Sequence, residues 1–353
     1  MRIAFIVTGL PPHDVGGTET QTMNLARNLA GRHEVTILTR RVKGAPDEER
    51  IDGVRIIRFR FFPFPVLRFF SHTLSCLRLV RKLKDETDCL FCMMLSPNGL
   101  VGALAARLFG MKSAASERGG DWYTGEKRFL GRRINGFVIR NSSVVIAQTD
   151  KIKREMLGRY PGARIEVINN GVDMSPIRAK GKAVVFAGNL QQRKGVAYLI
   201  EAMAKLDAEL IVIGDGPERA ALEQLARKLG ISCRAHFEGR VKPQDMRRHM
   251  ARGRVFVLPS VEGEGLPNVI LEAMSIGLPV VSTRISGIPD IVKDGETGFI
   301  VEPGDADALA DRIDRLITDK PLCDRMRAST LKEVRRYSWE SITRRVDEVL
   351  GSL

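Results

Sequence analysis

Three glutamates and a proline lie close together in the segment from Pro259 to Thr283. Glu262 and Glu264 fall in a glycine-containing loop, and Pro267 suits the first position of a helix. Such a helix would direct its first N–H groups toward the loop, where they can hold an anion such as a diphosphate. Glu272 lies five residues further on, about 7.5 Å along the helix axis, where it can accept hydrogen bonds from a polyol. An isolated pair of glutamates could equally be solvated charges at a helix end.

Other segments of the chain favour the chemical interpretation. Glu264 and Glu272, separated by seven residues, resemble the E-x7-E element of the family 4 retaining glycosyltransferases. Further segments resemble motifs of that family in the same order, and together they cover essentially the whole chain. These are PPHDVGGTET (11–20), NNGVD (169–173), FAGNLQQRKG (186–195), GDGPER (214–219), FEGRV (237–241) and DGETGFIVEPGD (294–305). One such motif is weak evidence, whereas six or seven in register indicate the family.

The resemblance implies a GT-B fold, in which two Rossmann-like, doubly wound α/β domains face each other across a cleft. The second domain would hold a nucleotide-sugar donor and the first an acceptor. Lys194 would pair with the donor diphosphate, Glu264 with hydroxyls of the transferred sugar, and Glu272 with the ribose. The main-chain N–H of Gly17 would approach the phosphate, which requires a residue without a side chain. Arg240 and Val241 would lie near the base, and the other implied donor-site residues are Gly16, Asn189, Arg193, Gly216, Glu262, Gly265, Leu266, Asn268 and Val269.

The implied reaction is transfer of a hexose-type sugar from a UDP- or GDP-sugar to a glycan or lipid-linked acceptor, in the synthesis of cell-surface polysaccharide or glycolipid. Lys194 and helix N–H groups can neutralise the departing diphosphate, so no metal and no cofactor is expected. The family usually has arginine at position 189, where this chain has asparagine; Arg193 supplies the missing charge or is a surface group. The sequence does not distinguish front-face attack from a covalent intermediate.

A second departure lies in the segment SAASERGGDWY. Many family members carry a histidine before a glycine where this chain has Arg118, followed by Gly119, Gly120 and Asp121. Arginine can hold a phosphate or a hydroxyl but cannot act as a base near neutral pH. Arg118 is therefore a candidate catalytic residue and Asp121 a candidate binding residue, unless the two form an ion pair that ties down a loop. His13, in the glycine loop, either lies near the acceptor or is simply solvated.

Strand-like apolar runs alternate with helical periodicity along the chain, which predicts parallel sheets covered by helices on both faces. Each half has its own set, so two doubly wound domains are expected. We place the first domain at residues 1–173, a linker rich in Pro, Gly and charge at 174–182, and the second domain at 183–337. An amphipathic tail at 338–353 predicts a terminal helix, and the resemblance implies that this helix packs back on the first domain.

The positive charge is concentrated in the first half of the chain. Residues 1–175 carry 28 basic and 17 acidic side chains, whereas the remaining residues carry 28 and 25. Nine basic residues and one acidic residue fall between positions 50 and 84, and six phenylalanines lie between Phe59 and Phe70. This interleaving fits peripheral contact with an anionic membrane, which predicts a cytoplasmic protein at the inner membrane face. Alternatively, half of the rings belong to the core and the arginines only cover it.

Several classes of protein are excluded by what the sequence lacks. No apolar run approaches the length of a membrane span, and the run at Ile3–Val7 is too short for a signal peptide. GDGPER lacks the third glycine of the dinucleotide fingerprint, no Walker A motif occurs, and no nucleic-acid motif accompanies the charge. Five cysteines are scattered along the chain; Cys89 and Cys92 form a CxxC in an apolar, strand-like run, where buried thiols are expected rather than a redox or zinc site.

Two alternative functions stay open. One is another GT-B activity, such as that of a nucleotide-sugar epimerase or a phosphorylase. The other is a catalytically weakened paralogue that binds a glycan or a partner enzyme, which the departures at Asn189 and Arg118 favour.

Overall fold

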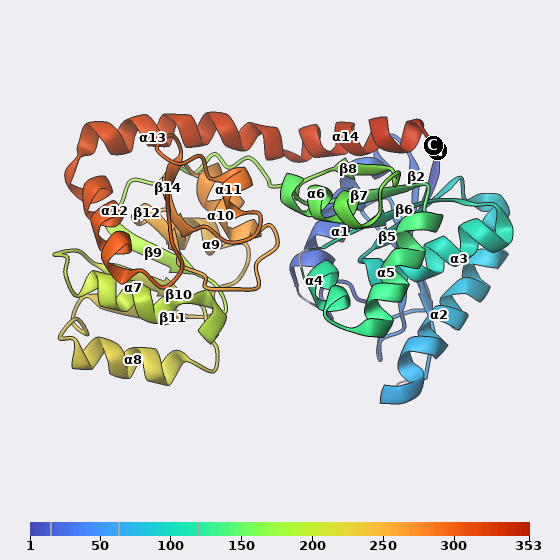
Figure 1. Ribbon diagram of the computed structural model, residues 1–353, viewed down its shortest axis with the longest axis horizontal. Coiled ribbons are helices and arrows are strands. Elements are labelled where there is room, and N and C mark those ends of the chain that lie inside the picture. The colour runs from blue at the N-terminus through green and yellow to red at the C-terminus, as the bar shows by residue number, and fades with distance from the viewer. Residues whose placement is uncertain (15, 63, 119) are drawn as a thin grey trace. The chain divides into compact units, whose positions relative to one another are not determined.

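The computed structural model describes residues 1–14, 16–62, 64–118 and 120–353, and it divides into two compact units (Figure 1). Unit 1 consists of Met1–Gly171 together with Trp339–Leu353, and unit 2 is Val172–Ser338. Each unit holds one sheet, and the strand order of each sheet runs outward in both directions from a central pair of strands. The expectation of two doubly wound α/β domains is therefore confirmed.

The sheet of unit 1 has eight strands in the order β3-β4-β2-β1-β5-β6-β7-β8. Every neighbouring pair is parallel except the β3–β4 hairpin. The strands are β1 (Arg2–Ile6), β2 (Glu34–Arg40), β3 (Glu48–Ile51), β4 (Val54–Phe59), β5 (Cys89–Met93), β6 (Lys112–Ser116), β7 (Val144–Ala147) and β8 (Ile165–Val167). The helical segments are α1 (Gly17–Ala30), α2 (Pro65–Lys82), η1 (Lys84–Glu86), η2 (Leu95–Gly99), α3 (Leu100–Phe109), α4 (Asp121–Glu126), α5 (Phe129–Asn141), α6 (Asp150–Arg159) and α14 (Trp339–Gly351).

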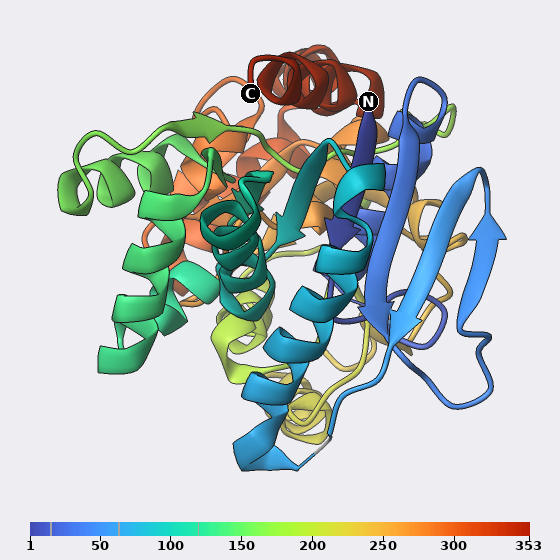
Figure 2. The ribbon, with the colours of Figure 1, turned by 90° about the vertical axis from the view of Figure 1, so that its right-hand side faces the viewer.

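Strand β1 shows why helices cover both faces of this sheet. Successive side chains of a strand point to opposite faces. Ile3 and Phe5 pack in the cluster that includes α1 and α14, whereas Ala4 and Ile6 pack in the cluster of α2 and α3. Because all four side chains are buried, the strand appears in the sequence as a continuous apolar run. Figure 2 shows α2 running along its face of the sheet, antiparallel to β2 and β4.

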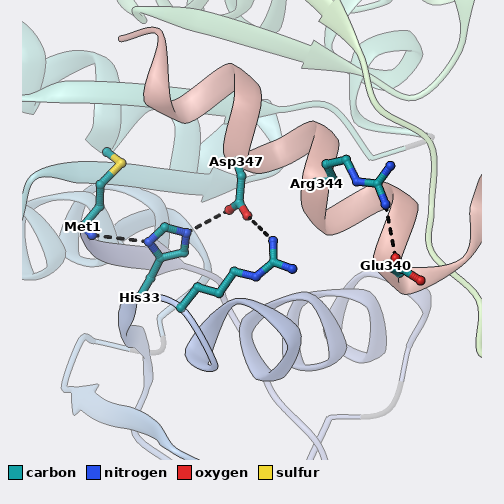
Figure 3. Close-up of polar contacts among 6 residues, drawn as sticks. Met1, His33, Glu340, Arg344 and Asp347 are labelled. Carbon is teal, nitrogen blue, oxygen red and sulfur yellow. Dashed lines mark hydrogen bonds and ion pairs between the residues drawn. The ribbon is translucent and has the colours of Figure 1, made fainter.

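The terminal helix α14 belongs to unit 1 through an apolar face that includes Trp339, Ile342 and Val346. On its polar side, the Asp347 carboxylate accepts a hydrogen bond from His33 at 2.8 Å and pairs with Arg32 at 3.3 Å (Figure 3). The chain therefore leaves unit 1 at Gly171 and returns to it at Trp339.

Unit 2 has a six-stranded, fully parallel sheet in the order β11-β10-β9-β12-β13-β14. The strands are β9 (Ala183–Ala187), β10 (Leu210–Ile213), β11 (Ala235–Gly239), β12 (Gly253–Leu258), β13 (Val280–Thr283) and β14 (Gly298–Val301). The helical segments are η3 (Gln192–Lys194), α7 (Val196–Met203), α8 (Arg219–Lys228), α9 (Met246–Met250), α10 (Asn268–Ser275), α11 (Ile288–Ile291), α12 (Ala306–Thr318), α13 (Lys320–Glu333) and η4 (Val334–Tyr337). The strand order reverses between β9 and β12, and ligands of open α/β sheets bind at such a switch point, beyond the carboxyl ends of the strands.

The segment expected as a linker, residues 174–182, packs on unit 2. The N–H of Ala179 donates to the carbonyl of Ile276 at 2.9 Å, and that of Lys180 donates to the carbonyl of Ala251 at 3.1 Å. Ser175 and Ala179 of this segment are buried and its other side chains are exposed or partly buried, but the backbone is fixed by these bonds. The boundary between the units consequently falls at Gly171, slightly earlier than expected.

Two other expectations concern membrane spans and thiols. Over the residues that the structure describes, no helix is both long and apolar enough to cross a membrane. Cys89 and Cys92 are buried free thiols, as predicted, and burial raises the pKa of both.

Candidate active site

Lys194 and Glu264 meet at the switch point of the unit 2 sheet. Lys194 ends the 3₁₀ turn η3 that follows β9, and Glu264 lies in the loop that follows β12. The two side chains are in direct contact, with Nζ of Lys194 2.5 Å from Oε1 of Glu264. Both are shielded from water, with side chains 12% and 6% exposed. The pair is thus a charged site beneath the surface, rather than two solvated loop charges.

Ser260 completes this cluster from the end of β12. Its hydroxyl is buried and donates a hydrogen bond to the same Glu264 oxygen at 2.6 Å. Thr283, at the end of the neighbouring strand β13, donates to the Ser260 carbonyl at 2.6 Å. The Glu264 carboxylate is therefore oriented by the ends of two strands, and sequence reasoning missed both hydroxyl residues because serine and threonine are common at strand ends.

Arg193 joins the loops that follow β9 and β12. Its guanidinium donates to the Gly263 carbonyl at 2.9 Å, and its own carbonyl accepts from the Val261 N–H at 2.8 Å. The residue was expected either to replace a missing positive charge or to lie on the surface. In the structure, these two hydrogen bonds join the loop that follows β9 to the loop that follows β12.

Two glycines allow the loops to pack this closely. Gly195 has φ +65°, and a Cβ there would lie 2.0 Å from the Pro259 carbonyl oxygen. At Gly216, after β10, a Cβ would lie 2.4 Å from the Leu190 carbonyl and 2.5 Å from the Asn189 side chain. A larger residue at either position would separate the loops at the carboxyl edge of the sheet.

The other expected donor-site residues follow the carboxyl ends of β9, β11 and β12 at the same edge of the sheet. Asn189, Arg240 and Glu262 are exposed, Leu266 is buried, and Val241, Gly265, Asn268 and Val269 are partly buried. Helix α10 begins at Asn268 rather than at Pro267, which is the N-cap residue with an extended ψ of 111°. The expected helix start was wrong by one residue, and Asn268 and Val269 form the first turn.

Glu272 lies further along α10 and is partly buried. Burial raises the pKa of its carboxyl, while Arg247 on α9 opposes the rise and Asp173 adds to it. Arg247 pairs with Asp173 at 3.5 Å, and both residues belong to unit 2. Sequence reasoning missed Arg247, because no local pattern links it to either carboxylate.

The glycine loop of unit 1 follows β1. Gly16 is the N-cap of α1, and a Cβ there would lie 2.3 Å from the Glu19 carboxylate. Gly17 is the first residue of the helix, and His13 is exposed. These residues lie at the carboxyl edge of their sheet, where the resemblance requires them.

Arg118 and Asp121 follow β6. Their side chains do not form an ion pair with each other within the salt-bridge distance. The Asp121 carboxylate accepts two main-chain hydrogen bonds, from Leu95 at 2.5 Å and Arg118 at 2.9 Å. The Arg118 guanidinium donates to the Asn170 side chain at 2.6 Å. Burial raises the pKa of Asp121 and lowers that of Arg118 to about 10. Gly119, which falls between them in the motif, lies outside the described residues.

A pocket of about 480 Å³ opens beside these two residues, entirely within unit 1. Its walls include Phe69 of α2, Met94 after β5, and Leu130 and Ile134 of α5, together with Arg118 and Asp121. Sequence reasoning missed α5 as part of a site. The signal was present in the run KRFLGRR (127–133), which is apolar and basic like the segment at 59–70.

The segment at 50–84, expected to contact a membrane, divides into two parts. Arg55 and Arg58 belong to the sheet, where they pair with Glu48 and Glu49. Phe59 is buried, whereas Phe62, Phe64 and Phe70 are each about two-thirds exposed at 67%, 65% and 66%.

Among the described residues, no group of three His, Cys, Asp or Glu side chains is placed to hold a metal ion.

Two family models match adjoining parts of the chain. The model of glycosyltransferase family 4 matches residues 15–175, and that of glycosyl transferases group 1 matches residues 172–333. An uncharacterized glycosyltransferase of Methanocaldococcus jannaschii is 27% identical over 98% of this chain and 96% of its own length. A sulfoquinovosyl transferase of Arabidopsis thaliana is 27% identical over 98% of this chain and 72% of its own length.

Solved structures with the same fold agree with these matches. Sucrose-phosphate synthase from Thermosynechococcus elongatus has a TM-score of 0.85 at 22% identity and covers 99% of this chain and 98% of its own. Anabaena HepE, solved in complex with UDP-glucose, has a TM-score of 0.80 at 22% identity and covers all of both chains. At this level of identity the likeness shows the fold, which consists of two Rossmann-like domains.

Proposed function

The chain belongs to the glycosyltransferases of family 4 and group 1, which have the GT-B fold, and on that premise we propose that it is a retaining hexosyltransferase with a UDP- or GDP-sugar donor. The acceptor is a glycan or a lipid-linked sugar. The complex of HepE with UDP-glucose supports a nucleotide sugar as the class of donor, because that protein has the same fold over its full length.

The observation that carries this proposal is the shielded contact of Lys194 with Glu264 at the switch point. A donor diphosphate entering beside Lys194 would compete with Glu264 for the ammonium group, which acts as a compact point charge. The released Glu264 carboxylate, still held by Ser260, would then accept hydroxyls of the sugar. The two residues of this contact thereby each supply a contact to the donor.

Departure of the nucleoside diphosphate is the step that needs stabilisation. Lys194 and the main chain at the start of α10 would balance the charge that develops on the leaving oxygens, so the reaction as proposed requires no metal and no cofactor. Glu272 would hold the ribose, and Arg240 and Val241 would lie near the base.

We assign the acceptor to unit 1, where Arg118, Asp121 and Arg128 are charged residues that line the pocket. Arginine would hold a phosphate or hydroxyl there and would not act as a base. Contact of the segment 50–84 with an anionic membrane, at the inner face, would bring a lipid-linked acceptor to this unit.

A thermal-shift screen with UDP- and GDP-sugars tests the donor site, because a ligand that binds only the folded state stabilises it by about 2.7 kcal/mol at 100 times Kd. We expect one of the two nucleotides to stabilise the wild type and to lose that effect in Lys194→Met. The matched control is Lys205→Met, since Lys205 also pairs with a carboxylate in unit 2, Asp307, but on the surface. An equal shift in Lys194→Met and the wild type would reject the site, and donor binding without transfer to any acceptor would favour a binding paralogue.

A further inference from the structure

Exposed large apolar side chains are concentrated on one part of unit 1. Ten such side chains are exposed among the described residues, and seven of them lie in the α2 region and at the start of α5. We call these seven the apolar rim: Phe62, Phe64, Leu67, Phe70, Leu74, Phe129 and Leu130. Single exposed apolar residues are ordinary, whereas a concentration of this kind marks a binding surface.

The rim comes from two elements that are far apart in the sequence. Leu67, Phe70 and Leu74 follow one stripe of α2 at helical spacing, and Phe129 and Leu130 form the first turn of α5. Phe69 of α2 and Leu130 of α5 line the same pocket, so the two parts of the rim flank one opening. Because α2 follows β4, its first turn lies at the carboxyl edge of the sheet, where Figure 2 shows it.

The pocket also contains a buried positive charge. Arg118 lines it, and the Nε of this guanidinium is buried without a hydrogen-bond partner among the described residues. Burial lowers the pKa of this guanidinium, the carboxylates of Glu117 and Asp121 lie near enough to raise it, and Asp121 also accepts main-chain hydrogen bonds from Leu95 and Arg118. Arg128 lines the same pocket and is exposed, so two guanidinium groups can meet an anionic ligand there.

Both elements of the rim are rich in arginine and poor in carboxylates. The sequence from 60 to 84 and that from 127 to 149 contain no aspartate or glutamate. Arg68 follows Leu67, and Arg128, Arg132 and Arg133 accompany Phe129 and Leu130; all four arginines are exposed. The surface therefore combines apolar rings with positive charge, which suits the boundary of an anionic bilayer.

We infer that the pocket takes the phosphate-bearing head of a lipid-linked acceptor, and that the apolar rim holds its hydrocarbon chain at the membrane surface. This inference rests on the proposed function and narrows its acceptor from glycans in general to amphiphiles with an anionic head. Arg118 binds the phosphate, while α2 and α5 enter the headgroup boundary on either side of the opening.

The first experiment measures sedimentation of the full-length protein with vesicles of phosphatidylcholine and phosphatidylglycerol. The double variants Phe70→Ser/Leu74→Ser and Phe129→Ser/Leu130→Ser each remove one side of the rim, and we expect each to weaken binding at least about tenfold. Leu108→Ser is the control, because Leu108 is 60% exposed in unit 1 but does not belong to the rim. Undiminished binding of either double variant would overturn the two-sided rim.

The second experiment separates a lipid phosphate from a free phosphate. Dodecyl phosphate, dodecyl maltoside and inorganic phosphate are titrated below their micellar concentrations into the wild type, Arg118→Met and Arg118→Lys. We expect dodecyl phosphate to bind at least about tenfold tighter than either other probe, to lose this advantage in Arg118→Met and to regain part of it in Arg118→Lys. Equal binding of inorganic phosphate would show a site for a water-soluble phosphate, and equal binding of dodecyl maltoside would show that the charge has no role; either result would overturn the inference.

The nucleotide screen keeps this inference distinguishable from the proposed function. The donor residues lie in unit 2, so the rim variants should retain the full thermal shift with the nucleotide sugar. Loss of nucleotide binding in the wild type would reject the transferase, whereas normal nucleotide binding without preference for dodecyl phosphate would reject only the lipid acceptor.

Discussion

At the scale of the residue, the contact between Lys194 and Glu264 is what the sequence could not predict. The motifs indicate both residue types, but the two positions lie 70 residues apart. Their contact depends on the adjacency of β9 and β12 in the sheet, and on loops drawn together by Arg193 and by close approach at Gly195. Ser260 escaped notice for the same reason, since only the folded chain places its hydroxyl on the carboxylate.

In the proposed donor site Ser260 would be a positioning residue, because its hydroxyl bonds to Glu264 and would act on the donor only through it. Ser260→Ala removes one hydrogen bond to Glu264 and should lower the free energy of unfolding by about 1 kcal/mol. The loss of orientation should also reduce kcat/KM by about tenfold, mainly through KM for the donor. Urea unfolding and steady-state kinetics measure the two effects. A stability loss with unchanged KM would show that Ser260 serves the fold alone.

At the scale of the element, α2 has a buried side that differs sharply from its rim. His72 is 3% exposed, and its ring lies edge-on to Phe59 and Phe61 at 5.1 and 5.5 Å between centroids. Neither ring nitrogen has a partner among the described residues. Burial, with a smaller contribution from Arg68, lowers the pKa of His72 to about 4. The helix is therefore held against the sheet by a neutral histidine.

Stability should fall in mild acid because of this histidine. The folded pKa lies below the unfolded value of about 6.5, so the unfolded state takes up the proton first as the pH falls. Stability is then lost between about pH 6.5 and pH 4, and the part lost between pH 7 and pH 5 is about 2 kcal/mol. His72→Phe should remove that part of the loss. Urea unfolding at the two pH values measures it, and an identical pH dependence of variant and wild type would contradict the assignment.

For the helix α14 and the NNGVD segment, the sequence predicts the elements but not the packing between them. Amphipathic spacing predicted the terminal helix, but periodicity could not say where it packs. In the structure, Gly171 lies against the Trp339 ring, where a Cβ would come within 2.3 Å of a ring carbon. The buried side chain of Gln21 exchanges two hydrogen bonds with the Gly171 main chain at 2.8 and 2.9 Å. The close packing against Trp339 of α14 therefore requires glycine at position 171. The motif alone does not reveal this requirement, because α14 is distant in the sequence.

At the scale of the whole molecule, the uneven charge follows the two units. Unit 2 carries basic and acidic side chains in nearly equal number, and unit 1 carries most of the excess positive charge. Part of that excess is internal, since Arg55 and Arg58 pair with carboxylates of the neighbouring strand. Arg68, Arg128, Arg132 and Arg133 accompany the apolar rim in the sequence, and only half of this rim was evident there because α2 and α5 come to line one pocket only in the folded chain.

Binding to anionic vesicles should consequently depend on salt in a characteristic way. Charge attraction is screened as the Debye length shrinks from about 10 Å at 0.1 M to 3 Å at 1 M salt, whereas burial of the rim is not. We expect sedimentation with the vesicles to weaken severalfold over this range without vanishing, and to vanish at high salt in Phe129→Ser/Leu130→Ser. Binding that does not change with either the salt concentration or the lipid charge would contradict the role of the arginines.

The central claim is that Lys194 and Glu264 form the donor site of a working transferase. The most direct measurement is nucleotide release and sugar transfer by wild type, Lys194→Met and Lys205→Met, with the donor that the thermal screen selects. We predict that Lys194→Met lowers kcat/KM by at least about 100-fold while Lys205→Met keeps wild-type turnover. Near-normal turnover by a folded Lys194→Met protein would contradict the account.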